Sequence, residues 1–392
     1  MIFAGVDIAK TDHVIDCVDE RGTRISKPMS FKNDAAGFEK CIAWLEGVAE
    51  KPEDAVIAME ATGHYWMACF TYLVARGWTV CVINPMHVHA VRNLKSLSGI
   101  KNDRIDAFLI AETLRIGEYD ATKLATDEVQ SLRELTRYRQ SLRDQIAETK
   151  TKVICLMDSY FPEYASLFAD MFGAASMALL QEACLPADIA RKTTPGIEKI
   201  ISEASRGRFK TEKAAQIRAC AKASVGIRIG SDAASLAIRD YIDLIAFLEG
   251  KIAKADAEIE RILEKVEPLI LTIPGISVTL GAQIVAEIGD IARFRNASAL
   301  VKYAGLNSGV NQSGQFEAQG APITKKGSPY LRRAIWLAAD RARNCDPKLK
   351  EFYNKKIDEG KPHRVAVTAV ARKLCHIIFA VMRDQVPFDS TK

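Results

Sequence analysis

The chain has 392 residues, a length at which a single hydrophobic core has stopped growing, so two or three folded units are expected. Apolar residues make up 48% and charged residues 26%, which excludes a disordered or collagen-like chain. The 54 Lys and Arg nearly balance the 49 Asp and Glu. The net charge of +5 therefore permits a polyanionic partner without requiring one, and the local placement of charge matters more.

Cysteine usage and hydropathy indicate the compartment. Nine cysteines are scattered along the chain with no CxxC spacing, and we expect them to be reduced thiols of a cytosolic protein. The apolar start, Met1 to Val6, has no basic region and is interrupted by Asp7, so it is not a signal peptide. No stretch elsewhere is expected to reach the length of a membrane span. The sequence therefore predicts a soluble intracellular protein with no membrane partner.

Residues 1–120 alternate between strand and helix patterns. Short apolar or β-branched runs at 2–8, 13–18 and about 24–31 predict an antiparallel meander. A helix is then expected at about 34–49, a strand at 54–59, a helix at 64–76, a strand at 78–83, and helices after Pro85 and after Asn102. Three strands followed by alternating α and β elements is the order of the RNase H-like α/β fold, which we predict for this domain.

Residues 121–266 are expected to form a long-helix region. Apolar residues recur at heptad spacing between about 128 and 158, where Arg139 and Thr149 fill two positions of the seam, and again from Tyr241 through Leu244 and Leu248 to Val266. Two such helices can pair as an antiparallel coiled-coil arm, dimerise with a second chain, or pack in an ordinary bundle. The stretch 160–235 has a helical bias and is expected to be an insertion that joins the two helices.

Residues 267–392 are expected to form a mainly α-helical C-terminal domain, because short helices alternate with Pro and Gly turns. The segment 271–276 with a helix at 277–288 resembles a helix-hairpin-helix, in which backbone N–H groups near Gly275 would hold a DNA phosphate. The alternative is a plain turn between packed helices. A last amphipathic helix covers about 364–383.

A basic cluster in this domain surrounds a Gly-Ser-Pro turn. It comprises Lys325, Lys326, Arg332 and Arg333, with Tyr330 and Trp336 nearby. Such a cluster suits binding to a nucleic-acid backbone. The alternative is a solvated surface.

Four acidic residues stand where a metal site would need them. Asp7 interrupts the first apolar strand, and Glu60 ends the fourth, at the edge where open α/β sheets bind ligands. Asp103 and Asp106 lie one helical turn apart, so they share a helix face. Because adjacent carboxylates repel unless a cation separates them, the four predict a site for Mg²⁺ or Mn²⁺. The alternative is that Asp103 caps its helix and Asp106 favours the helix dipole.

Several cations accompany these acids along the chain. Lys10 follows Asp7, and Lys95, Lys101 and Arg104 lie close to Asp103 and Asp106. They could neutralise a phosphate of the substrate, or they could be ordinary solvated surface charges. We predict Lys10, Lys101 and Arg104 as nucleic-acid-binding residues.

The motifs resemble the DEDD transposases of bacterial insertion sequences, a family that includes the Piv and MooV DNA invertases. The resemblance rests on GVDIAK at 5–10, EATGHYW at 60–66, VINP at 82–85 and KNDRIDAFLIAE at 101–112 in the RuvC-like half. In the second half it rests on IPGIS at 273–277, FRNASALVKYAGL at 294–306, SG at 313–314 and KKGSPYLRRAIW at 325–336. These motifs span most of the chain outside the long-helix region.

The resemblance implies an enzyme that cuts and rejoins donor and target DNA in a bacterial cytoplasm, at the nucleoid when it acts. It implies that Asp7, Glu60, Asp103 and Asp106 are the metal ligands. It also implies that Ser313 is a catalytic serine that forms a phosphoserine intermediate together with the acidic site of a partner protomer. Ser308, in the same loop, is a rival nucleophile because the loop before Ser313 is less basic than the family leads us to expect.

The resemblance further implies a bridge RNA that pairs with both DNAs, and a homodimer or tetramer formed through the long helices. Three other functions compete with this one. A Holliday-junction resolvase type of endonuclease would use the acids alone to activate water. A sugar-kinase-like phosphotransferase would need a second phosphate-binding glycine loop, which the sequence lacks. A coiled-coil DNA-binding protein without activity would leave the four acids unexplained.

Overall fold

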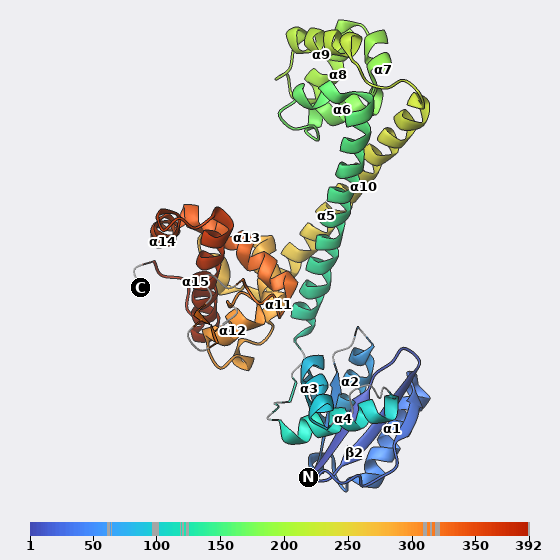
Figure 1. The fold of residues 1–392 in the computed structure, drawn as a ribbon, viewed down its shortest axis with the longest axis vertical. Helices are drawn as coiled ribbons and strands as arrows, with labels where there is room; N and C mark the ends of the chain where they lie inside the picture. The colour runs from blue at the N-terminus through green and yellow to red at the C-terminus, as the bar shows by residue number, and fades with distance from the viewer. Residues whose placement is uncertain are drawn as a thin grey trace. The chain divides into compact units, whose positions relative to one another are not determined.

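The computed structural model describes residues 1–60, 63, 65–95, 102–117, 119, 121–122, 125–308, 312–313, 316–317 and 322–390. The chain divides into two compact units, Met1–Leu124 and Ala125–Lys392 (Figure 1). The first unit ends close to the expected boundary at 120. The second unit contains both the expected long-helix region and the expected C-terminal domain, and the separation of these two at 266/267 stays a prediction.

The first unit is built on a five-stranded mixed sheet. Its strands are β1 (Ile2–Asp7), β2 (Asp12–Val18), β3 (Met29–Lys32), β4 (Ala55–Glu60) and β5 (Thr79–Ile83), in the order β3-β2-β1-β4-β5. The first three strands form the antiparallel meander, and β1, β4 and β5 run parallel. This order, with β1 central and β4 beside it, confirms the predicted RNase H-like fold.

Helices cover both faces of the sheet. The helices of this unit are α1 (Ala35–Val48), the short η1 (Pro52–Asp54), α2 (Trp66–Ala75), α3 (Pro85–Leu94) and α4 (Asp103–Ile116). Ala4, Val6, Ile57 and Met59 pack with α1 and α2. Ala58 and the inward residues of β5 pack with α3 and α4. Because successive side chains of a strand point to opposite faces, these two cores fix which face each strand residue points to.

Helix α4 crosses β1 with almost no space between the backbones. A Cβ atom on Gly5 would lie 2.2 Å from the carbonyl oxygen of Ala107 and 2.3 Å from the nitrogen of Ala111, so only glycine fits there. The later part of α4 lies beside the turn after β2, because a Cβ on Gly22 would be 2.9 Å from a carboxylate oxygen of Glu112. Helix α4 therefore runs antiparallel to β1, and its first turn lies at the end of β1 where Asp7 stands.

The second unit contains two long helices, α5 (Asp127–Tyr160) and α10 (Ser231–Val266). Leu132 packs near Ile259 and Ile262, and Leu142 packs near Ile245 and Leu248, so the two helices pair antiparallel within one chain. Arg139, which interrupts the apolar seam, forms an ion pair across it with Asp256. The antiparallel arm is therefore confirmed for these two helices within one chain, and dimerisation with a second chain stays a prediction.

The predicted seam of α10 is wrong in its first half. Leu244 is 41% exposed and Tyr241 is only partly buried, whereas Ile238, Ile242 and Ile245 are buried. Both sets are apolar and spaced three or four residues apart, so heptad counting cannot choose between them. From Leu248 onward the seam is as predicted.

The segment between the long helices folds as a helical bundle, which confirms its helical bias and its place as an insertion. It contains η2 (Pro162–Ser166), α6 (Ala174–Glu182), α7 (Pro186–Arg191), α8 (Thr194–Ala204) and α9 (Thr211–Ala223). The bundle has its own core, which includes the fully buried Phe161 and Tyr164 together with Met157 of α5 and Ile238 of α10.

The rest of the second unit packs around α13 and α15. It contains η3 (Leu269–Thr272), α11 (Val278–Ile288), η4 (Ile291–Arg293), α12 (Ala297–Tyr303), β6 (Gln312–Ser313), β7 (Phe316–Glu317), α13 (Pro329–Cys345), α14 (Pro347–Asp358) and α15 (His363–Asp384). Among the described residues, α15 is long and apolar enough to cross a membrane, which corrects the expectation that no stretch reaches that length. Its inner face, including Val367 and Ile378, belongs to the core of this unit.

Candidate functional site

Asp7 and Glu60 end two adjacent parallel strands. Val6 is in register with Met59, so Asp7 and Glu60, one residue further along, come to the same edge of the sheet. Gly5 and Ala58 face α4, and side chains two residues apart in a strand share a face. Asp7 and Glu60 therefore project from the face of the sheet that α4 covers, and both side chains are partly exposed.

The other two predicted acids open α4. Asn102 is the N-cap, because its side-chain oxygen accepts a hydrogen bond from the Arg104 nitrogen at 3.0 Å. Asp103 is thus the first residue inside the helix, and the proposed capping role for it is wrong. Asp103 and Asp106 lie in the first turn, where the helix dipole favours negative charge. Because α4 runs antiparallel to β1, this turn lies at the sheet edge where Asp7 and Glu60 end.

The donor set at this edge fits a hard divalent cation chemically, since such ions take carboxylate oxygens. Among the residues that the structure describes, however, no three His, Cys, Asp or Glu side chains converge closely enough to hold a metal. The carboxylate of Asp106 instead forms an ion pair with Arg92 of α3, and both side chains are largely buried. The fold brings the four acids to one edge, and their role as metal ligands stays a prediction.

The cations near the acids differ in their surroundings. Lys10 and Arg104 are exposed. Lys95 forms an ion pair with the fully buried carboxylate of Glu112, which Arg115 also binds at 2.7 Å. Lys101 lies outside the described residues. Lys95 is therefore part of the framework of α4, while Lys10 and Arg104 remain accessible to a nucleic acid.

Sequence reasoning missed two charged residues of this unit. Arg92 precedes the acidic helix in the last turn of α3, and Glu112 lies on the same helix as the predicted ligands. Burial alone would raise the pKa of Glu112, but hydrogen bonds and charge from Arg115 and Lys95 outweigh it and hold the pKa below its usual value. The sequence signal for both was weak, since a charge of either sign is ordinary on a helix.

The candidate serines lie in the segment that links α12 to α13. Ser313 lies in the short strand β6, and it pairs with Phe316 of β7. The side chain of Ser313 lies outside the described residues. Ser308 is exposed and forms a β-bridge with Ile323, next to a hydrogen bond from the Thr324 nitrogen to the Asn307 oxygen at 2.9 Å. The positions of the two serines do not show which of them is the nucleophile, and Ser313 stays a prediction.

The predicted basic cluster divides into two kinds of residue. Lys325 and Lys326 are exposed, and Arg333 pairs at the surface with Asp144 of α5 at 3.3 Å. Arg332 is partly buried and donates hydrogen bonds to the carbonyl oxygens of Lys325 and Ala304, at 3.2 and 3.4 Å. Arg332 therefore holds the basic turn in place, and contact with DNA by any of the four stays a prediction.

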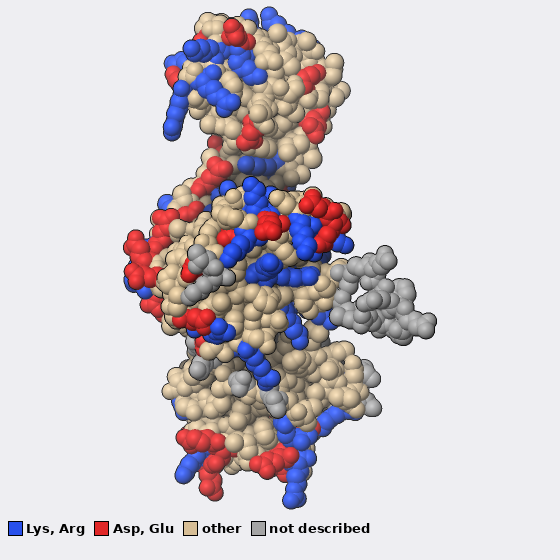
Figure 2. Space-filling model, turned by 90° about the vertical axis from the view of Figure 1, so that its left-hand side faces the viewer, with Lys and Arg blue, Asp and Glu red and all other residues tan. Residues whose placement is uncertain are grey.

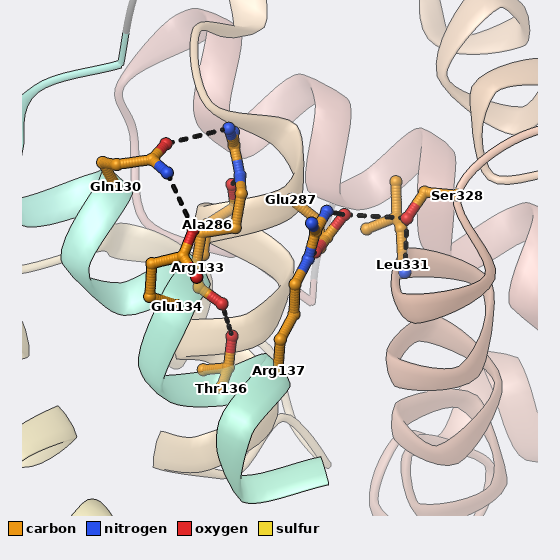
Figure 3. Close-up of polar contacts among 9 residues, drawn as sticks. All are labelled: Gln130, Arg133, Glu134, Thr136, Arg137, Ala286, Glu287, Ser328 and Leu331. Carbon is orange, nitrogen blue, oxygen red and sulfur yellow. Dashed lines mark hydrogen bonds and ion pairs between the residues drawn. The ribbon is translucent and has the colours of Figure 1, made fainter. Parts of the chain in front are cut away.

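A buried carboxylate supports the same turn (Figure 3). Glu287 of α11 is 1% exposed and accepts hydrogen bonds from Arg137 of α5 at 2.7 and 3.1 Å. It also accepts one from Ser328 at 2.7 Å, and Ser328 is the N-cap of α13. Arg133, also on α5, donates to the carbonyl oxygen of Ala286 at 2.9 Å. Sequence reasoning missed Glu287, which joins three helices at the start of α13.

Gly275 has a packing explanation. Its φ of 91° lies in the left-handed region, and a Cβ there would lie 2.5 Å from the Cα and nitrogen of Ala342 in α13. The glycine thus allows the turn before α11 to approach α13 closely. Whether its N–H also holds a DNA phosphate stays a prediction.

Two family models match the chain. One, a transposase model of the DEDD type associated with IS110, matches residues 4–162. The other, described as the transposase IS116/IS110/IS902 family, matches residues 267–354. The chain belongs to the DEDD transposase family of insertion sequences. It is therefore a DNA transposase, as the sequence motifs predicted, and DNA is its partner.

Relatives of this transposase match along nearly its full length. The putative mini-circle transposase for IS117 of Streptomyces coelicolor is 25% identical over 100% of this chain and 96% of its own. The 42 kDa protein of insertion element IS900 of Mycobacterium paratuberculosis is 26% identical, covering 99% and 97%. The pilin gene-inverting protein of Moraxella bovis is 23% identical, covering 99% and 97%.

Among solved structures, Thermus thermophilus RuvC in complex with a Holliday junction substrate is similar to part of the transposase. The match has a TM-score of 0.25 and 17% identity, and it covers 31% of this chain and 99% of RuvC.

Proposed function

We propose that this transposase cuts and rejoins DNA strands with a divalent ion held by Asp7, Glu60, Asp103 and Asp106, and with Ser313 as the nucleophile. The ion would be Mg²⁺ or Mn²⁺, because all four donors are carboxylates. One observation carries the proposal: two adjacent strands and the first turn of α4 bring the four acids to one sheet edge. The family match supports the reaction, and the motif around 313 supports the serine.

The four carboxylates would hold the divalent ion beside the reacting phosphate, and the serine would exchange one ester bond for another. A bound divalent ion supplies positive charge against the negative charge that builds up on the phosphate. The Oγ of Ser313 attacks the phosphorus and forms a phosphoserine, while one bridging P–O bond breaks and its oxygen leaves with a proton as a hydroxyl. A hydroxyl of the receiving strand then attacks the phosphoserine, which restores a DNA phosphodiester and returns the proton to the serine.

The basic residues would hold the DNA backbone. Lys10, Lys101 and Arg104 lie near the acids in sequence, and the turn at 325–333 contributes Lys325, Lys326, Arg332 and Arg333, with the Gly275 backbone as a further phosphate contact. Such contacts would make binding fall steeply with salt. The family resemblance also leads us to propose a bridge RNA as partner, a homodimer or tetramer, and action at the nucleoid in the cytoplasm.

The test measures strand cleavage and covalent protein–DNA adducts with the full chain, supercoiled DNA that contains the element ends, and Mg²⁺. Ser313→Ala should abolish both the adduct and strand transfer, since it removes the proposed nucleophile. Asp7→Asn should abolish both as well, by removing a metal ligand. Ser308→Ala is the matched control in the same loop and should keep most activity.

The opposite outcomes separate the competing mechanisms. Full cleavage without an adduct in Ser313→Ala would show a hydrolytic nuclease that uses the acids alone. If Ser308→Ala lost the adduct while Ser313→Ala still formed it, Ser308 would be the nucleophile. Activity that is unchanged by a chelator and by Asp7→Asn would remove the metal site from the mechanism.

A further inference from the structure

A groove between α14 and α15 lies outside the acids, the serine loop and the basic turn. It has a volume of about 620 Å³, within the range of sites for small organic groups. Leu349 and Phe352 of α14, Ile377 of α15 and Phe388 of the C-terminal segment line it. The Phe388 nitrogen donates a hydrogen bond to the Thr272 hydroxyl at 2.8 Å, which holds the C-terminal segment in place.

Charged side chains flank the apolar lining, and the cations among them outnumber the two carboxylates, Asp346 and Asp389. The ammonium of Lys373 lies 4.1 Å from the centre of the Phe352 ring, and that of Lys356 lies 5.6 Å from it. Lys348 and His376 also line the groove and are exposed. Among the described residues, no carboxylate forms an ion pair with Lys373, whereas Lys356 is paired with Glu359 at 2.7 Å. Figure 2 turns the side with α14 toward the viewer and shows Lys and Arg, with Asp and Glu among them, on this part of the second unit.

The groove is connected to the loop of the candidate serines. Arg372 lines it and donates a hydrogen bond from Nε to the carbonyl oxygen of Leu306 at 2.7 Å. Leu306 stands two residues before Ser308, in the segment that leads to Ser313. A ligand that presses on Arg372 would therefore act on the start of that loop.

We propose that this groove binds an unpaired nucleotide of single-stranded DNA, with its base against Phe352 and its phosphate at Lys373 and Lys348. An aromatic ring beside a cationic rim matches the two parts of a nucleotide, since bases stack on aromatic side chains and phosphates attract lysines. A duplex would offer only phosphates and would leave the apolar lining unused. An enzyme that exchanges DNA strands exposes unpaired nucleotides, and this groove would hold one beside the serine loop.

The test measures binding by fluorescence anisotropy with the full chain and no divalent ion, so that it does not depend on the proposed metal or nucleophile. The probes are a labelled oligothymidylate and an abasic strand with the same number of phosphates. The wild type should bind the base-containing strand about 5- to 100-fold more tightly, as expected for one stacked base. Phe352→Ala should abolish this preference, and Lys373→Gln should weaken both strands together.

Phe247→Ala is the matched control. Phe247 of α10 is 59% exposed and also has a lysine ammonium, that of Lys251, 5.0 Å from its ring centre, but it lies outside the groove. Its replacement should change neither affinity. Because Phe352→Ala could loosen α14, circular dichroism melting of each variant accompanies the titration, and Phe352→Leu provides a second variant that keeps the apolar volume without the ring. Phe352→Leu should also lose the preference.

Three results would overturn the proposal. In the first, the wild type shows no preference for bases over abasic sites. In the second, Phe352→Leu keeps the preference. In the third, an RNA strand or an acidic aromatic peptide displaces the oligothymidylate at lower concentration than unlabelled oligothymidylate does, which would assign the groove to a different ligand.

Discussion

At the scale of single residues, the two buried carboxylates Glu112 and Glu287 form ion pairs that stabilise the fold. The exposed cations near the acids are accessible to DNA. Glu112 and Glu287 are almost inaccessible and each binds cationic side chains from another segment. Breaking such a pair leaves a charge in a place that water reaches poorly, which costs more than an exposed pair contributes. Both residues are therefore expected to matter for folding rather than for chemistry.

Glu112 should make the first unit sensitive to acid. Its pKa is held below the usual value of 4.5. Its contribution is therefore fully present above pH 4.5 and is lost as the pH falls through the lowered pKa of the folded state. Glu112→Gln should lower the free energy of unfolding by about 1–2 kcal/mol at neutral pH, and this difference should shrink in acid.

Urea unfolding followed by tryptophan fluorescence measures this effect, because Trp44, Trp66 and Trp78 lie in the first unit and only Trp336 lies in the second. Glu20→Gln is the control, since Glu20 pairs with the N-terminal amine at the surface. A difference between wild type and Glu112→Gln that grew toward low pH would contradict the assigned pKa direction.

Glu287 should be needed for the stability of the second unit. Glu287→Ala leaves Arg137 and the Ser328 hydroxyl without their acceptor and should lower the free energy of unfolding by about 2 kcal/mol. Glu258→Ala, which removes an exposed pair with Arg261 on α10, should cost under about 0.5 kcal/mol. Circular dichroism during urea unfolding compares the two variants, and equal midpoints would mean that the Glu287 network adds no stability.

At the scale of elements, the contact between β1 and α4 determines whether the four acids can meet. Gly5→Ala would place a methyl group against the backbone of Ala107 and Ala111, which cannot rotate away as a side chain can. We expect a loss of about 1–3 kcal/mol in the stability of the first unit, with a parallel loss of strand cleavage.

Gly47→Ala is the control for Gly5→Ala. No atom lies within 4 Å of a Cβ at Gly47, and this position is helical. Alanine there should stabilise the unit by up to about 1 kcal/mol. Thermal melts of both variants decide the matter, and a Gly5→Ala variant as stable and active as wild type would mean that α4 does not pack on β1 this closely.

The seam of α10 gives a direct comparison of two neighbouring apolar residues. Ile245 is fully buried and Leu244 is 41% exposed, although the predicted seam included Leu244 and not Ile245. Ile245→Ala should cost about 2–5 kcal/mol and Leu244→Ala less than about 0.5 kcal/mol. Urea unfolding monitored by circular dichroism measures both. The reverse order of costs would restore the seam predicted from the sequence.

Most elements could be predicted because each signal was local. Strand alternation, the helix caps and the heptads located most strands of the first unit and both long helices within a few residues. There are two exceptions: β3 begins about five residues later than predicted, and α10 begins ten residues before its predicted seam. The choice between Leu244 and Ile245 depends on the partner helix, so one helix alone could not settle it. Likewise, the pairing of Arg92 with Asp106 joins side chains of two separate helices, and no sequence spacing indicates it.

At the scale of the whole molecule, the acids belong to the first unit and the candidate serine to the second. The family resemblance implies that the serine works with the acidic site of a partner protomer. Neither the composition nor the motifs could show which chain completes which site, because a sequence describes one protomer only. The arrangement can nevertheless be tested with two inactive variants.

Asp7→Asn and Ser313→Ala proteins, each inactive alone, should recover activity when they are unfolded, mixed and refolded together. If the serine meets the acids of its partner, a mixed dimer contains one site in which both halves are intact. A random mixture should then give roughly a quarter of wild-type strand transfer, since half of the dimers are mixed and half of their sites are intact. If both halves came from one chain, every site would carry one defect, and mixing would restore nothing. Mixing Asp7→Asn with Glu60→Gln is the control. Both defects lie in the acidic half, so every site keeps a defective set of acids and mixing should restore nothing.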